Sequence, residues 1–145
     1  MTVFPEGPAA SPGFLLWHVT LRWQRLITDE LRPLNLTHVQ FVLLASSWWL
    51  GRADGPPNQL AVAAHANTNI KMTSEILRKL EDKGLIEQTT DPDDRRAKLV
   101  RVTSAGADLA ARAIAVVEKA DLAFFGSTSS TLVPILQDLA ALDSR

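Results

Sequence analysis

The order of helices and strands expected in residues 58–102 restricts the fold of this chain more than any other feature. A short helix is expected at about residues 58–65, and Ala66-Asn67-Thr68 has the composition of a tight turn. Asn69 then caps a second helix, which ends at Gly84, a residue suited to the left-handed position after a helix. Two helices joined by so tight a turn form a helix-turn-helix.

The second helix, expected over residues 69–83, has two chemically different faces. The side chains spaced for the core are Thr73, Ile76, Leu77 and Leu80. The opposite face, at spacings of i, i+3, i+4 and i+7, carries Lys71, Ser74, Glu75 and Arg78. The polar face is therefore the one available for recognition.

Two short segments after this helix, residues 85–90 and 97–102, alternate apolar and polar side chains as strands do. The polar run between them, residues 91–96, has turn chemistry. We therefore expect a β-hairpin, and a hairpin directly after a helix-turn-helix is a wing. The predicted fold class is mainly α with a small β-hairpin wing.

Four further helices flank this unit. They are expected from Ser11-Pro12 to Pro33, from a Thr37 capping box to Gly51, over residues 103–125, and over residues 130–142. The first is apolar around much more than one stripe, so it needs burial on two sides, against the core and against a partner subunit. Residues 1–13 hold three prolines and Glu6, and are expected to form a flexible arm rather than a signal peptide.

Composition sets limits on the class of protein. The net charge is −1, and residues 57–101 hold eight basic and seven acidic side chains, so any DNA surface must come from the placement of charge. The sequence has no cysteine, which excludes disulfides and thiolate sites. The absence of cysteine makes a cytoplasmic protein the natural expectation. No apolar run reaches the ~18 residues of a membrane-spanning helix, so we expect no membrane contact.

No pattern in the sequence indicates an enzyme. His18, His38 and His65 fall on three different predicted helices, without the spacing of metal ligands. A glycine-rich phosphate loop and a nucleophile elbow are both absent. We therefore predict no catalytic residue, no metal site and no cofactor.

The stretch LEDKGLIEQTTDPDDRRAKLVRVTSAG, residues 80–106, resembles the MarR family of transcriptional regulators in its helix end, its wing and the start of the next helix. The earlier LNLTHVQFVLL is similar to the start of the family's second helix. The resemblance covers about residues 14–142. Asn35 stands where the family often has glycine, and residues 68–72 differ from its usual reading-helix start, so no target sequence is carried over.

The resemblance implies a homodimer. Residues 14–35 and 103–145 would form an interlocking dimerisation module, and residues 36–102 a winged helix-turn-helix domain that binds double-stranded DNA. The implied function is a sequence-specific regulator, expected to be a repressor, on a pseudo-palindromic operator. Because the charge is near neutral, a winged-helix protein-interaction module without DNA binding is the alternative.

Candidate DNA contacts lie on the hairpin and the reading helix. Arg95 and Arg96 suit a narrow minor groove; in the family the arginine matching Arg96 enters it, and the acid matching Asp94 orients the wing. The candidates for base edges and phosphates are Thr68, Asn69, Lys71, Ser74, Arg78 and Lys98. The simpler explanations are a plain N-cap for Asn69 and solvated local ion pairs for the wing arginines.

Many proteins of this family release DNA when a small aromatic or phenolic molecule enters a cleft between the dimerisation module and the winged domain. The candidate lining residues here are Trp17, His18, Leu21, His38, Phe41 and Trp48. Aromatic side chains at helical spacing could instead form core. His18 and His38 are the polar members that could orient an anion.

Overall fold

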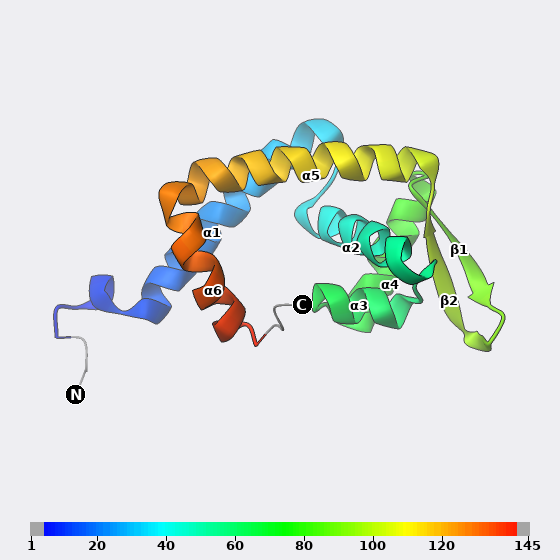
Figure 1. Ribbon diagram of the computed structural model, residues 1–145, viewed down its shortest axis with the longest axis horizontal. Helices are drawn as coiled ribbons and strands as arrows, with labels where there is room; N and C mark the ends of the chain where they lie inside the picture. The colour runs from blue at the N-terminus through cyan, green and yellow to red at the C-terminus, as the bar shows by residue number, and fades with distance from the viewer. Residues whose placement is uncertain (1–4, 142–145) are drawn as a thin grey trace.

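The computed structural model describes residues 5–141 as a mainly helical chain with one two-stranded antiparallel sheet (Figure 1). The helices are α1 (Pro12–Leu31), α2 (His38–Asp54), α3 (Gln59–Ala66), α4 (Ile70–Asp82), α5 (Ser104–Phe125) and α6 (Ser129–Leu139). Short 3-10 turns are η1 (Pro8–Ala10), η2 (Arg32–Leu34) and η3 (Gly126–Thr128), and the hairpin is β1 (Ile86–Asp91) with β2 (Asp94–Val102). The predicted fold class, a winged helix-turn-helix with flanking helices, is confirmed.

The molecule has two parts joined by its longest helix. Helices α2, α3 and α4 and the hairpin gather at one end, which we call the winged unit, residues 36–102 (Figure 1). Helix α5 begins beside the hairpin and runs along α2 and α1 to α6 at the other end (Figure 1). None of the helices within residues 5–141 is long and apolar enough to cross a membrane.

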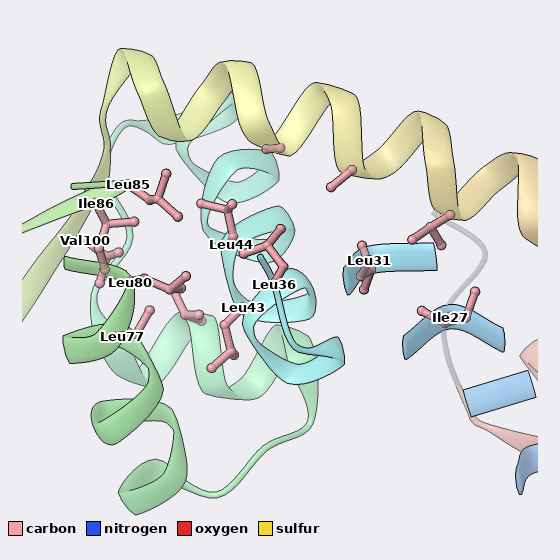
Figure 2. Close-up of a cluster of buried hydrophobic side chains, with 14 of the residues drawn as sticks. Ile27, Leu31, Leu36, Leu43, Leu44, Leu77, Leu80, Leu85, Ile86 and Val100 are labelled. Carbon is pink, nitrogen blue, oxygen red and sulfur yellow. The ribbon is translucent and has the colours of Figure 1, made fainter. Parts of the chain in front are cut away.

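The hydrophobic core of the winged unit lies between α2, α4 and the base of the hairpin. Figure 2 shows the side chains that converge there, which include Leu43, Leu44, Leu77, Leu80, Leu85, Ile86 and Val100. Each fully buried leucine of this kind contributes about 2 kcal/mol through removal of apolar surface from water. Ile27 and Leu31 of α1 continue the core along α5.

Local capping explains where most helices begin. The Thr37 hydroxyl accepts a hydrogen bond from the amide of Gln40 at 3.1 Å, and the Gln40 side chain accepts one from the Thr37 amide at 3.2 Å. This is the predicted capping box of α2. Ser11, Asn69 and Thr103 likewise cap α1, α4 and α5. Asn35 has a left-handed conformation, with a φ of 56°.

Two predicted helix ends were wrong. Helix α2 continues through Gly51 to Asp54, because Gly51 accepts helical dihedral angles and the helix stops only where Gly55, with a φ of 80°, precedes Pro56. Helix α6 ends at Leu139, and the predicted last residue, Leu142, lies outside the described residues. In the predicted N-terminal arm, η1 precedes α1, which begins at Pro12.

A close backbone approach fixes α5 to the end of α4. The Thr103 hydroxyl donates to the carbonyl of Gly84 at 2.7 Å, and the Thr103 amide donates to the carbonyl of Leu85 at 3.0 Å. One turn later, a Cβ on Gly106 would lie 1.9 Å from the Leu85 carbonyl oxygen. Only glycine fits at this position. The start of α5 therefore packs directly against the backbone at Leu85, just before β1, and this contact sets the direction of α5.

Candidate nucleic-acid interface

The start of α4 is held by hydrogen bonds from residues just before it. The Asn69 side chain accepts from the amide of Met72 at 2.7 Å, so Asn69 is the N-cap. The Thr73 hydroxyl donates to the carbonyl of Asn69 at 2.8 Å and lies 2.6 Å from the Thr68 hydroxyl. Because Thr73 has one hydroxyl proton, Thr68 is the donor of that second bond. The Thr68 hydroxyl proton is therefore engaged within the fold.

Helix α4 separates its faces as its sequence predicts. Thr73, Leu77 and Leu80 are buried. The exposed face carries Lys71, Ser74, Glu75 and Arg78. Neither Lys71 nor Arg78 makes a salt bridge within residues 5–141. Their charges are therefore available to an anionic partner.

The wing differs from the prediction at its tip. Strand pairing is regular from Ile86 opposite Val102 to Thr90 opposite Lys98, and then shifts so that Asp91 faces Asp94. Arg95 and Arg96 thus lie on strand β2, in an irregular segment, and not in a long turn over residues 91–96 as expected. Both are exposed.

Aspartate side chains explain this short tip. The Asp91 carboxylate accepts a hydrogen bond from the amide of Asp93 at 2.9 Å, and the Asp94 carboxylate accepts one from the amide of Arg96 at 3.0 Å. Such bonds two residues along the chain stabilise turns and bulges. They return the chain to β2 at Asp94, so the predicted strand start at Ala97 was three residues late.

Contacts far apart in the sequence anchor the base of the wing to both helices of the helix-turn-helix. The Gln88 amide on β1 donates to the Glu81 carboxylate of α4 at 2.8 Å, and the Gln88 side chain accepts from Gln59 of α3. The amide of Val100 on β2 donates to the carbonyl of Pro57 at 2.8 Å. The wing and α4 therefore form one rigid surface. This network could not be predicted from the sequence, because no local signal links residues on three separate elements.

A groove of about 330 Å³ lies between α3, α4 and β2. It brings together four of the predicted site residues, namely Ser74, Asp94, Arg96 and Lys98. Asn69, Lys71, Arg78 and Arg95 do not line it. The remaining lining residues, which the sequence analysis did not single out as site residues, are Gln59, Leu60, Ile70 and Ala97.

The six side chains predicted to line one ligand cleft do not come together in the protomer. Trp48 lies ten residues beyond His38 on α2, about 15 Å along the helix, and lines a separate hollow with Arg52. On α1, Trp17, His18 and Leu21 are exposed, and Phe41 packs against the core. Helical spacing does not show which turn of a long helix a partner element covers, so a common cleft for all six side chains stays a prediction.

His38 lies where α2 of the winged unit meets α1. It lines two shallow grooves, of about 330 and 510 Å³, each of which also includes Thr28 and Thr37. Its ring packs edge-on against Trp23 with centroids 5.1 Å apart, and the Trp23 indole donates to Asp121 at 2.8 Å. Burial lowers the pKa of His38, and the negative charge of Asp121 partly opposes that shift.

Comparison with known proteins gives consistent matches. The MarR family model matches residues 36–98. YdcH of Bacillus subtilis (strain 168), an uncharacterized HTH-type transcriptional regulator, is 44% identical over 122 residues, which span 84% of this chain and 83% of that protein.

Solved structures also share the fold. CouR from Rhodococcus jostii RHA1, solved bound to p-coumaroyl-CoA, has a TM-score of 0.81 and 28% identity, and the match covers 92% of each chain. A mutant of MarR from E. coli, complexed with operator DNA, has a TM-score of 0.78 and 23% identity, covering 96% of this chain and 99% of that chain. At 23% identity, this second match shows a shared fold alone.

Proposed function

This chain belongs to the MarR family of transcriptional regulators, and we propose that it acts in the cytoplasm as a homodimeric repressor that binds a pseudo-palindromic operator. The observation that carries the proposal is one exposed surface, on which the polar face of α4 lies beside Arg96 and Lys98 of the wing. In such a complex α4 enters the major groove. The wing arginines then reach the adjacent minor groove, where the negative potential is strongest if the groove is narrow.

The proposed dimer is supported by apolar surface outside the winged unit. Exposed large apolar side chains on α1, α5 and α6 include Phe14, Leu15, Leu16, Trp17, Val19, Leu21, Leu122, Val133, Ile135, Leu136 and Leu139. Several of them border an apolar hollow of about 690 Å³ between α1, α5 and α6. Exposed apolar surface of this extent marks an interface. A second copy packed here would make residues 14–35 and 103–145 the dimerisation module.

Binding to DNA from upstream of the protein's own gene tests the main proposal. We expect a dissociation constant that rises steeply with salt, because neutralised phosphates release counterions. Deletion of the gene should raise transcription of the bound promoter if the protein is a repressor. Absence of binding at low salt would contradict the proposal and favour a protein-interaction module.

We further propose that a small aromatic or phenolic effector binds beside His38. The bound p-coumaroyl-CoA of CouR supports this chemical class. The grooves beside His38 support this location for the effector site, because they lie where α1 meets α2. Calorimetric titration with a panel of aromatic acids should find a ligand whose affinity falls in the His38→Ala protein. Unchanged affinity in that variant would rule out the site.

A further inference from the structure

The winged unit exposes few large apolar side chains. Within residues 36–102 they are Trp49, Leu60 and Ile70. Leu60 is 65% exposed and Ile70 is 46% exposed. These two come from different helices, α3 and α4, yet both line the groove that the wing closes. An exposed apolar pair in the same groove as the charged side chains of the wing needs an explanation.

The position of Ile70 is specific. It is the first residue of α4, directly after the Asn69 cap, and Ser74 follows one helical turn later on the same face. Residues at the start of a recognition helix are the ones that reach base edges in helix-turn-helix proteins. Ile70 and Ser74 both line the groove, so they would meet neighbouring parts of the same ligand.

The charges around the groove restrict what can occupy it. Arg96 and Lys98 of β2 line it together with one acidic residue, Asp94, so the positive charges are in excess. Neither Arg96 nor Lys98 makes a salt bridge within residues 5–141. The occupant should therefore present an anionic group next to a small apolar one. Duplex DNA does so, because thymine carries a C5-methyl group in the major groove, close to the phosphate backbone.

We propose that Ile70, supported by Leu60, contacts the C5-methyl group of a pyrimidine in each half-site, which in unmodified DNA is a thymine. The inference rests on the proposed function, in which α4 enters the major groove. Lys98 would hold the phosphate backbone between the two grooves, Arg96 would reach the adjacent minor groove, and Ile70 would supply sequence preference without charge. 5-Methylcytosine carries the same methyl group, so it is the second possible source of this contact.

The experiment uses the full chain and a duplex selected by the wild-type protein from a random library. Each thymine is replaced in turn by deoxyuridine, which removes only the methyl group, and dissociation constants are measured by fluorescence anisotropy. We expect one thymine per half-site at which this change weakens binding about fourfold, the effect of one buried methyl group. At that position, comparison of 5-methylcytosine with cytosine decides whether any C5-methyl pyrimidine is accepted or thymine alone.

The Ile70→Ala protein should bind the thymine and deoxyuridine duplexes equally, with an unchanged dependence on salt. Trp49→Ala is the matched control, since Trp49 is exposed in the same unit but lies outside the groove, and it should keep the fourfold preference. Circular dichroism checks that both variants retain their helices.

Two results would overturn the inference: wild-type protein that distinguishes no thymine from uracil, or Ile70→Ala protein that keeps the full preference. Failure of the wild-type protein to select any duplex would overturn the proposed function as well. The two failures are therefore distinguishable.

Discussion

The carboxylate of Asp94 accepts a hydrogen bond from the backbone amide of Arg96 at 3.0 Å. This bond spans the start of the irregular segment of β2 and fixes the backbone from which the Arg96 side chain projects. A negative residue at the tip of a DNA-binding wing is unfavourable for phosphate contact. The presence of Asp94 is explained if its hydrogen bond, which orients the wing, favours DNA binding more than its negative charge opposes it.

Substitution of Asp94 separates these two effects. Asp94→Asn keeps a side-chain acceptor and removes the charge, whereas Asp94→Ala removes both. We expect the Asn variant to bind DNA about fivefold more tightly than the Ala variant, as for the loss of one hydrogen bond. Fluorescence anisotropy at fixed salt measures the ratio. Equal affinities would show that the bond does not orient the wing.

Arg96→Ala should weaken binding about tenfold on all DNA sequences, because the side chain contributes charge rather than base recognition. The slope of log affinity against log salt should fall by about one unit. Arg25→Ala is the control, since Arg25 is an exposed arginine on α1, far along the chain from the wing. Equal affinity of Arg96→Ala and wild type would exclude Arg96 from the interface. Changes at Lys71 or Ser74 should instead alter sequence preference.

Gly106→Ala should destabilise the fold by about 3 kcal/mol, the upper range for overpacking, because the new Cβ would lie 1.9 Å from the Leu85 carbonyl oxygen. Urea denaturation measures the free energy of unfolding. Gly13→Ala is the matched control: Gly13 is in helix α1 and its Cβ would meet nothing within 4 Å. That change should stabilise by up to about 1 kcal/mol. Equal stability of the two variants would contradict the close approach.

The local parts of this fold were predictable. The caps at Thr37, Asn69 and Thr103 each involve an amide three residues later, so a few neighbouring residues determine them. Gly51 misled the prediction because glycine both ends helices and tolerates their interiors. The residues around it do not decide which role it takes, whereas Gly55 before Pro56 does.

The candidate site was predictable only where periodicity defines it. The polar face of α4 follows from a spacing of 3.6 residues. The hydrogen bonds that join Gln88 to Glu81 and to Gln59 depend on how three elements pack, so no local pattern encodes them. Ile70 is apolar, like a typical core residue, and its exposure follows from its place at the very start of α4.

Leu136→Glu should convert the proposed dimer to a monomer. Leu136 lies on α6, is 41% exposed and borders the apolar hollow between α1, α5 and α6. A carboxylate buried in an apolar interface has no partner and is strongly unfavourable. Light scattering should give the chain mass of 15.9 kDa for this variant and twice that value for wild type. Thr89→Glu, on the exposed face of β1, should remain dimeric, and a wild-type monomer would contradict the proposed assembly.

Acidification should destabilise the protein through His38. Burial lowers the pKa of this imidazole in the folded state, so the unfolded chain takes up a proton first as the pH falls. Stability should therefore decrease as the pH drops below about 6.5, the ordinary histidine value, and level off below the folded pKa. The His38→Gln protein should lose less stability between these limits in urea denaturation. Because the charge of Asp121 raises the pKa, Asp121→Asn should lower it further in an NMR titration. An Asp121→Asn protein with a higher His38 pKa would contradict this electrostatic coupling.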